Sequence, residues 1–303
     1  MKPRLMRLVR PIVDRFPQLA STYRYFRDSH QLYEQHQRSF AGFRFAGSQL
    51  MIDGQFEPEE TRVIQGILPS VDTLINIGAN IGYYCCVALA QGKKVIAFEP
   101  VHLNVQQLLR NVRANGWDRS IEIHPIALGN RVGAIELYGG GTAASLVKGW
   151  ANIPHEYVNL VPCNTLDNVV GSRLQGSRCL IIVDIEGAEE QMLEGAIAVL
   201  SMHPKPVWMV EISISEHQPG GATINPNLLA TFRRFWASGY EAWTAVSQTR
   251  LISPQEVEDI ARNGKDTLGL HNFLFVERGM EAEIHEAHPE DDSPADLTGV
   301  GRK

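Results

Sequence analysis

The sequence has no long hydrophobic run. Its 303 residues contain no stretch of about 18 consecutive apolar residues, which argues against a membrane-spanning helix. The N-terminus, MKPRLMRLVRPIV, also lacks the uninterrupted apolar core of a signal peptide. A cytoplasmic location is therefore the expectation, and 44% hydrophobic residues suffice for one sizeable core or two small ones.

Cysteine is also scarce. The chain has four cysteines, and no two of them form a C-x-x-C pair. Cys85 and Cys86 are adjacent within a predicted helix, whereas Cys163 and Cys179 stand alone. This spacing favours neither a zinc site nor a disulfide framework, so we expect buried thiols.

Charge is low in the central part of the chain, and most of the formal net charge of −6 lies at the C-terminus. Residues 281–303 hold seven acids against Arg302 and Lys303. Because this segment has too little apolar surface to offset its ordering entropy, we expect residues 280–303 to be a disordered acidic tail. A nucleic-acid-binding protein needs a basic stripe across its working face, so the almost neutral body predicts no nucleic-acid partner.

The N-terminal segment has the opposite charge. Residues 1–30 carry seven Lys and Arg residues against two Asp residues. Apolar residues between Leu5 and Phe16 follow one helical face, although Pro11 interrupts it. We expect residues 1–49 to form a helical extension, which either associates with a membrane surface or packs on the domain or on a second subunit.

From about residue 71 onward, short apolar runs alternate with helical patterns. Runs typical of strands occupy residues 74–77, 94–99, 121–128, 179–186 and 207–212, and two more, at 240–246 and 272–278, close the sheet, the last of them antiparallel. Helical patterns occupy residues 81–91, the segment from Pro100 to Asn115-Gly116, and the segment after residue 186 through Leu200. Strands buried on both faces predict an α/β fold with a doubly wound, mostly parallel sheet. Residues 130–170 are expected to add strands around a glycine-rich loop.

The stretch LINIGANIGYY, residues 74–84, joins a predicted strand to a predicted helix through two glycines. Such a turn brings N–H groups at a helix N-terminus close to an anionic ligand. The dinucleotide pattern G-x-G-x-x-G needs a second glycine to admit a pyrophosphate, but this chain has Asn80 there and Tyr83 at the third position. Glu99, at the end of the next strand, is placed to accept both hydroxyl protons of a ribose. S-adenosylmethionine, which has a ribose and no phosphate, therefore fits better than a dinucleotide.

A series of motifs then follows in a fixed order over most of residues 50–278: FEPEE, INIGANIGYY, AFEP, NVRANG, PIALG, NTLDNVV, VDIEGAEEQMLEGA, VEI and NFLFVE. In this combination the chain resembles the FkbM-type methyltransferases, which belong to the class I S-adenosylmethionine-dependent group. The resemblance implies a Rossmann-like methyltransferase domain over residues 50–279, with S-adenosylmethionine as cofactor.

The resemblance also implies a set of cofactor-binding residues. They are Asn76, Gly78, Ala79, Asn80, Gly82, Tyr83, Glu99, Pro100, Ala127, Leu128 and Asp184. Gly78, Asn80 and Gly82 are expected at the methionine end, Glu99 at the ribose, and Ala127 with Leu128 near the adenine. Two positions depart from the family pattern. Asn76 replaces a usual aspartate, which predicts weaker cofactor binding, and Ile182 replaces a frequent lysine.

Carboxylates end three of the predicted strands. If the methyl acceptor is an alcohol, it must lose a proton, and Asp184 is the first candidate for the general base, with Glu186 second. Acids at these positions are equally typical of helix N-terminal capping. Glu211 and His217 are candidates to orient the acceptor, or to bind a divalent ion such as magnesium together with Asp184.

The resemblance points to O-methylation of a sugar hydroxyl in a glycan, a glycolipid or a glycosylated metabolite. We expect the acceptor to lie beside residues 139–142, Ser145 and Trp150, although simple hairpin turns explain these glycines equally well. Two other functions fit the sequence: an NAD-dependent oxidoreductase on the same architecture, and a non-catalytic scaffold that retains the pocket.

Overall fold

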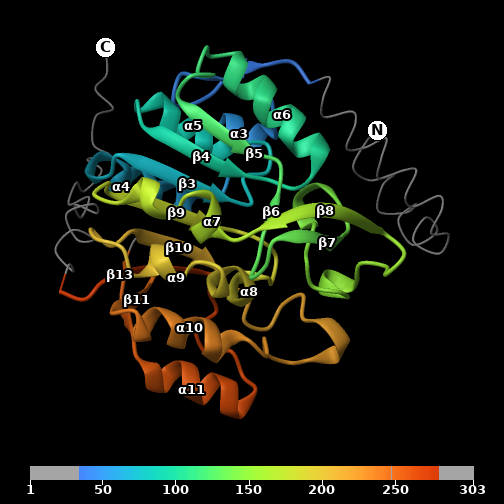
Figure 1. Cartoon of the computed structure of the whole chain (residues 1–303), viewed down its shortest axis with the longest axis vertical. Coiled ribbons are helices and arrows are strands. Elements are labelled where there is room, and N and C mark those ends of the chain that lie inside the picture. Colours follow the sequence, from blue (N-terminus) through green and yellow to red (C-terminus); the bar gives the residue numbers. More distant parts are fainter. Residues whose placement is uncertain (1–33, 247, 280–303) are drawn as a thin grey trace, which may run out of the picture.

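The computed structural model describes residues 34–246 and 248–279. A large sheet contains β3 (Thr73–Ile77), β4 (Lys94–Phe98), β5 (Ile121–His124), β9 (Cys179–Val183), β10 (Val207–Glu211), β11 (Tyr240–Thr244), β12 (Leu251–Ile252) and β13 (Asn272–Glu277). Their order across the sheet is β12-β11-β13-β10-β9-β3-β4-β5 (Figure 1). The five strands from β10 to β5 run parallel, whereas β13 is antiparallel to β10 and to β11. The predicted doubly wound, mostly parallel sheet is confirmed, as is its antiparallel last strand.

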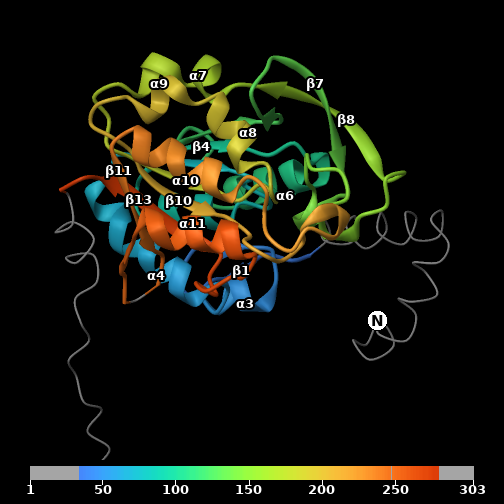
Figure 2. The same cartoon turned by 90° about the horizontal axis from the view of Figure 1, so that it is seen from below.

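Helices cover both faces of this sheet because its strands are apolar on both sides. On β3, Ile75 and Ile77 pack into one core cluster, while Leu74 packs into the other. The first face is covered by α7 (Leu166–Val169), α8 (Glu189–Glu194), α9 (Ile197–Leu200), α10 (Leu228–Ala237) and α11 (Pro254–Asn263). The second is covered by α3 (Gln49–Ile52), α4 (Pro58–Ile67), α5 (Tyr83–Ala90) and α6 (His102–Arg113). Figure 2 shows α7, α8 and α9 on one side of the strands, with α3 and α4 on the other.

The described residues also form short 3₁₀ helices. They are η1 (Leu68–Ser70), η2 (Gly141–Ala143), η3 (Trp150–Asn152), η4 (Gly171–Leu174) and η5 (Pro219–Gly221). All four cysteines are buried free thiols, as predicted. No helix of the described residues is long and apolar enough to cross a membrane.

The apolar run at residues 121–128 does not form the single strand expected there. It divides at Pro125, which has no N–H to donate to a continuing ladder. The second half becomes β6 (Ala127–Leu128), which joins β7 (Gly133–Tyr138) and β8 (Val158–Asn164) in a separate sheet with the order β6-β8-β7. These are the added strands predicted in the inserted segment. Figure 1 shows this small sheet beside the carboxyl ends of the parallel strands.

The helix expected after residue 186 is also divided. It ends at Glu194, and α9 begins as a new helix at Ile197. The carboxylate of Asp167, from α7, accepts hydrogen bonds from the N–H groups of Ala198 (2.9 Å) and Val199 (3.0 Å). Because a side chain from elsewhere in the fold caps this second helix start, local periodicity could not reveal the break.

The described part of the N-terminal extension is not helical before α3, in contrast to the expectation for residues 1–49. Residues 34–48 contain β1 (Gln37–Arg38) and β2 (Arg44–Phe45), which pair in an antiparallel ribbon. The Asn115 side chain donates to Arg44 O and accepts from Arg44 N, both at 2.8 Å, so it binds the ribbon as a neighbouring strand would. Residues 1–33 and the acidic tail at 280–303 lie outside the described residues.

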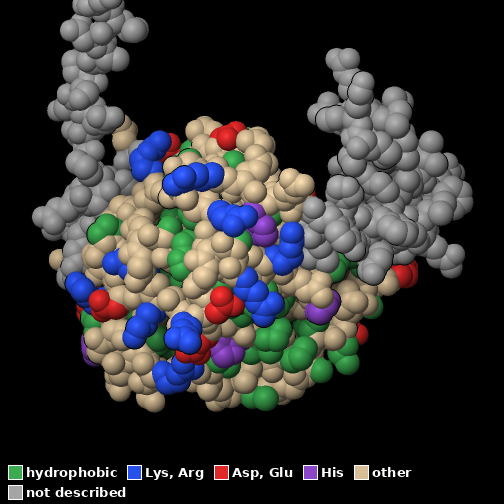
Figure 3. Space-filling view, turned by 90° about the horizontal axis from the view of Figure 1, so that it is seen from above, with side chains coloured by type: hydrophobic (Ala, Val, Ile, Leu, Met, Phe, Trp, Pro, Cys, Tyr) green, Lys and Arg blue, Asp and Glu red, His purple; other side chains and the backbone are tan. Residues whose placement is uncertain are grey.

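The charged side chains of one face are mostly basic. Figure 3 looks onto the side of the molecule that carries α6, where Lys and Arg side chains predominate and a smaller number of acidic ones lie among them. Arg113 at the end of α6, for example, pairs with Asp118 at 3.4 Å. The absence of a nucleic-acid partner stays a prediction.

The turns that follow β3 and β9 touch each other. Gly78 has a φ of +85°, and a Cβ at this position would overlap the carbonyl oxygen of Asp184. The Gly78 N–H donates to Phe98 O (2.9 Å), and the Asp184 N–H donates to Ile77 O (3.0 Å). The carboxyl ends of β3, β4 and β9 are therefore joined through backbone contacts at the point where the chain reverses its winding direction across the sheet.

We predict that Gly78→Ala lowers the free energy of unfolding by about 2 to 5 kcal/mol, because a backbone overlap adds to the cost of a positive φ. Gly116→Ala is the matched control, since its φ is +72° and no atom lies within 4 Å of the added Cβ. That variant should lose only about 1 to 2 kcal/mol. Chemical denaturation measures both. Equal losses would contradict the close approach at Gly78.

Candidate active site

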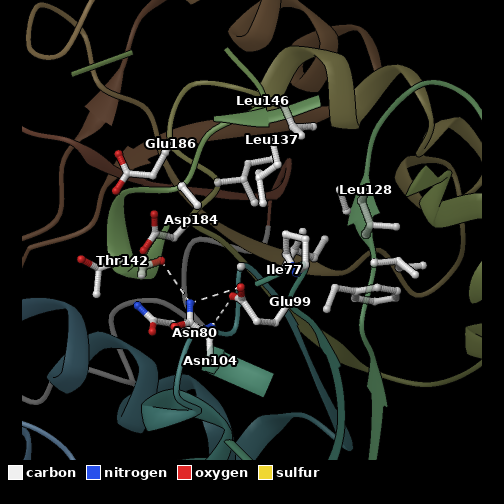
Figure 4. A pocket seen from close by; sticks show the side chains of 18 residues that line it. Ile77, Asn80, Glu99, Asn104, Leu128, Leu137, Thr142, Leu146, Asp184 and Glu186 are labelled. Carbon is white, nitrogen blue, oxygen red and sulfur yellow. Dashed lines mark hydrogen bonds between the residues drawn. The ribbon is translucent and has the colours of Figure 1, made fainter. Parts of the chain in front are cut away.

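A pocket of about 560 Å³, partly open to solvent, lies at the carboxyl ends of β3, β4 and β9. Segments of the small sheet and the loop after β7 form its other side (Figure 4). Eight of the residues predicted for the site line it: Gly78, Asn80, Glu99, Pro100, Ala127, Leu128, Asp184 and Glu186. In Figure 4, Asp184 and Glu186 lie toward one end of the pocket and Leu128 toward the other, with Glu99 between them.

Five other predicted residues do not line this pocket. Asn76 is 3% exposed, and its Nδ2 lies 3.4 Å from Cys85 Sγ. Ala79 is buried, and a Cβ on Gly82 would overlap Leu108, so this glycine allows close packing of α6. The remaining two are Tyr83, whose ring packs against Phe45, Phe56 and Tyr84, and Glu211, which ends β10.

Glu99 faces the glycine turn, as expected. Its Oε2 accepts from the N–H of Asn80 (2.8 Å), and its Oε1 accepts from the N–H of Val101 (2.8 Å) and the amide of Asn104 (3.2 Å). Burial raises the pKa of Glu99 to about 7, although these three hydrogen bonds oppose the shift. A buried carboxylate that accepts backbone N–H groups fixes the shape of the turn and still presents an acceptor to the pocket.

Most N–H groups of the turn are bonded within the protein. Those of Gly78 and Ala79 both donate to Phe98 O at 2.9 Å, that of Asn80 donates to Glu99, and that of Gly82 donates to Ala79 O at 2.9 Å. Among the described residues, Ile81 is the residue of this turn whose N–H donates to no protein acceptor. Binding of an anionic part of a ligand at this turn stays a prediction. The side-chain oxygen Oδ1 of Asn80 is buried and has no hydrogen-bond partner among the described residues.

Several residues around the pocket have a strained backbone. Asn80, Glu186, Glu57 and His217 are not glycines, yet each has a positive φ, from 42° to 62°. Such conformations cost roughly 1 to 3 kcal/mol each and persist where the surrounding structure imposes them, which is common at functional sites.

The carboxylates at this end of the pocket repel one another. Asp184 is accessible to solvent within the cleft, although protein atoms surround it closely, and its carboxylate makes no hydrogen bond to the described residues. The surrounding protein atoms shield the Asp184 carboxylate from bulk water, and this desolvation is the main cause that raises its pKa well above the usual value. The nearby charges of Glu211, Glu186 and Glu57 raise it further. Burial and the same neighbours raise the pKa of Glu211 to about 8.

Glu186 differs from Asp184 because protein donors bind it. The indole Nε1 of Trp150 donates to Glu186 Oε2 at 2.7 Å, and Ser145 Oγ donates to Glu186 O at 2.6 Å. Burial raises the pKa of Glu186, while the Trp150 hydrogen bond opposes that shift. Of the two predicted bases, Asp184 is thus the one whose carboxylate remains available to a ligand.

Comparison with known protein families identifies the domain. The sequence profile of the methyltransferase FkbM domain matches residues 76–240, which is more than half of the chain. The chain belongs to the FkbM methyltransferase family. The resemblance found in the sequence motifs is confirmed. No curated protein sequence matches the chain.

Solved structures of methyltransferases are similar to this FkbM domain at low identity. The methyltransferase FkbM from Methylobacillus flagellatus KT is 16% identical, with a TM-score of 0.40 over 84% of this chain and 60% of that one. This chain therefore spans less than two thirds of that protein. The precorrin-6y C5,15-methyltransferase from Geobacter metallireducens GS-15 is 14% identical, with a TM-score of 0.37 over 66% and 79% of the two chains. An O-methyltransferase family protein from Burkholderia thailandensis is 11% identical, with a TM-score of 0.36 over 76% and 57%.

Within the FkbM domain, the loop after β7 lines the pocket, and binding of the acceptor there stays a prediction. Gly141, Thr142 and Ala144 all contribute to the lining. Trp150, in contrast, is 2% exposed, and its ring lies directly over Gly187, where a Cβ would overlap it. The tryptophan therefore has no free face on which a sugar could stack, and it serves instead to hold Glu186.

Sequence reasoning missed Asn104, which is 4% exposed and lines the pocket. A signal was present in the sequence. Val101, Val105 and Leu108 define the core-facing stripe of α6, and position 104 belongs to the same stripe by helical spacing. A polar residue at a core position needs hydrogen-bond partners, which predicts a role beside Glu99.

The divalent site considered for Asp184, Glu211 and His217 is not assembled in the structure. Among residues 34–246 and 248–279, no three His, Cys, Asp or Glu side chains are placed to hold a metal ion. His217 is exposed, and its ring centroid lies 5.9 Å from that of Trp150.

We predict that the raised pKa values make the protein less stable as pH rises from about 5 to 8. A carboxyl group whose pKa is higher in the folded protein binds its proton more tightly there than in the unfolded chain. Its contribution to the free energy of unfolding is therefore complete below the pKa of the unfolded state, and it is lost as the pH rises through the pKa of the folded state. Glu211, with a pKa of about 8, is such a group. Relative to the wild type, Glu211→Gln should gain stability across this range, by at most about 1.4 kcal/mol per pH unit.

Chemical denaturation at several pH values measures this difference. Glu122→Gln is the control, because Arg173 lowers the pKa of Glu122 and so keeps it ionised in both states over the same range. The difference in the free energy of unfolding between Glu122→Gln and the wild type should stay constant over this pH range. If the free energies of unfolding of Glu211→Gln and the wild type change in parallel with pH, the prediction is contradicted.

Proposed function

We propose that this chain is an S-adenosylmethionine-dependent O-methyltransferase that acts on a hydroxyl group of a sugar, in a glycan, a glycolipid or a glycosylated metabolite. One observation carries the proposal. The polar side chains facing the pocket are mostly hydrogen-bond acceptors, namely Asn80, Glu99, Asp184 and Glu186, and no Lys or Arg is among its described lining residues. Such a pocket suits a ligand with positive charge and hydroxyl donors.

S-adenosylmethionine has these properties, because it carries a sulfonium, an ammonium group and a ribose diol. Glu99 would accept from the ribose, and the partnerless Oδ1 of Asn80 would accept from the ammonium group. Ala127 and Leu128 supply an apolar surface for the adenine. A dinucleotide fits poorly, since its pyrophosphate would lie among carboxylates with no Lys or Arg of the described lining to balance its charge.

The cofactor supplies an electrophilic methyl group when bound. The residues of the chain align the acceptor with it, and alignment accounts for much of the rate of an in-line displacement. Asp184 would take the proton of the acceptor hydroxyl while the methyl group passes from the sulfonium sulfur, which becomes a neutral thioether, to the hydroxyl oxygen. Burial and the neighbouring carboxylates raise the pKa of Asp184, and a positive charge beside it would oppose that shift. A bound sulfonium would thus favour the ionised carboxylate, which is the form that accepts a proton.

The acceptor side of the pocket favours neutral or positively charged compounds. Asp184 lines the pocket, and Glu211 and Glu57 lie close enough to raise its pKa, so these charges would repel a phosphorylated or carboxylated acceptor. A neutral sugar would instead offer hydroxyl donors to the lining carboxylates of Asp184 and Glu186. Recognition by hydrogen bonds also removes the need for an aromatic platform, which the buried Trp150 does not provide.

We predict that Asp184→Asn lowers methyl transfer by about 10²- to 10⁴-fold while the cofactor still binds. The assay incubates the protein with S-adenosylmethionine and a panel of neutral glycans, and mass spectrometry detects the gain of one methyl group. The matched control is Glu189→Gln. Glu189 belongs to the same segment and is 2% exposed, but it does not line the pocket. Its Oε1 accepts a hydrogen bond from the N–H of Gly187 at 2.8 Å. That variant should keep most of its activity.

The outcomes separate the competing functions. Full turnover by Asp184→Asn would remove Asp184 as the base. Cofactor binding without transfer to any acceptor of the panel would favour a non-catalytic scaffold. Binding of NAD in place of S-adenosylmethionine would favour an oxidoreductase.

A further inference from the structure

Asn104 connects the two sides of the pocket. It is the third residue of α6, and its Nδ2 lies 3.2 Å from Glu99 Oε1 and 3.1 Å from Gly141 O. The amide nitrogen has two hydrogens, and these two bonds use both. Figure 4 shows this bridge, with the Asn104 side chain between Glu99 and the segment that contains Thr142. One side chain thus contacts both the carboxylate on β4 and the loop that covers the pocket.

The covering loop, residues 139–144, is anchored firmly at its base. Tyr138 and Ser145 exchange two backbone hydrogen bonds at 2.8 and 2.9 Å, and Ser145 Oγ is bound to Glu186 O. The tip, residues 140–144, is held differently. In the tip, the Asn104 amide donates a hydrogen bond to Gly141 O at 3.1 Å.

A ribose at Glu99 must affect this bridge. A carboxylate offers about four lone-pair positions, and the protein already uses three of those on Glu99: two on Oε1 and one on Oε2. A ribose diol donates two hydrogen bonds, but only one position is free. The second hydroxyl therefore competes with Asn104 for Oε1, and Asn104 must change partners when the diol binds.

We propose that Asn104 is a positioning residue that couples nucleoside binding to closure of the loop tip. When a ribose diol takes the Oε1 position on Glu99, the Asn104 side chain turns to the diol and bridges it to Gly141, which holds residues 140–144 over the bound nucleoside. This inference rests on the proposed function, because it takes the ligand of Glu99 to be the ribose of a nucleoside cofactor.

Hydrogen exchange of the loop tip tests the coupling. In the wild type, saturating S-adenosylmethionine should slow amide exchange of residues 140–144 by roughly three- to tenfold, because the bound diol would fix the Asn104 side chain that holds Gly141 O; the size is that of about one hydrogen bond in local opening. The adenosine derivative 5′-methylthioadenosine has the diol without the charged end, and it should slow exchange similarly. Asn104→Ala should abolish both effects when each ligand is supplied at a concentration that saturates the variant.

Asn111→Ala is the matched control. Asn111 is also a buried asparagine on α6, and its Nδ2 donates to Ala46 O (3.2 Å) and Ile81 O (3.0 Å), away from the loop. This variant loses comparable hydrogen bonds and should keep the ligand-dependent protection of residues 140–144. Asn104→Ser provides a second, smaller change if Asn104→Ala does not fold.

The results distinguish this inference from the proposed function. If the wild type binds S-adenosylmethionine and the tip is protected equally in the wild type and Asn104→Ala, the coupling through Asn104 is wrong. Absence of any binding of S-adenosylmethionine to the wild type would contradict the proposed function itself. Loss of the protection in Asn111→Ala as well would show that Asn104 acts only through the stability of α6.

Discussion

The contact between Gly78 and the Asp184 carbonyl is the constraint on which the pocket depends. It holds the ends of β3 and β9 together at the point where the chain changes winding direction, and the Phe98 carbonyl binds the same turn from β4. Ligands of open α/β sheets bind at such switch points because the connections diverge there and leave a crevice. A side chain at position 78 would force these strand ends apart, and Glu99 and Asp184 would no longer face one crevice.

The charge of the pocket then determines which ligands suit it. Carboxylates in and beside the pocket raise one another's pKa values, and no cationic side chain is among the described lining residues. Each carboxylate alone would be unremarkable at the end of a strand. Together they leave the site unfavourable to anions and short of positive charge, which a sulfonium supplies. In the proposed function, the same positive charge would oppose the upward shift in the pKa of Asp184.

The sequence predicted the features that depend on local pattern. Strand positions, the antiparallel last strand, the turn at Gly78 and the direction of Glu99 all follow from apolar runs and motif spacing. Features set by contacts between distant segments could not be predicted. The start of α9 depends on the Asp167 side chain, and the ribbon at Arg44 depends on the Asn115 side chain. Likewise, Trp150 was expected at the acceptor, but Gly187 lets its ring pack inward, where it binds Glu186.

Calorimetric titration of S-adenosylmethionine and NAD into the wild-type protein and Glu99→Gln tests the central claim most directly. The account predicts that the wild type binds S-adenosylmethionine and not NAD. It also predicts that Glu99→Gln weakens this binding by roughly ten- to a hundredfold, the effect of hydrogen bonds to a charged acceptor. Preference for NAD, or equal affinity of the two proteins for S-adenosylmethionine, would contradict it.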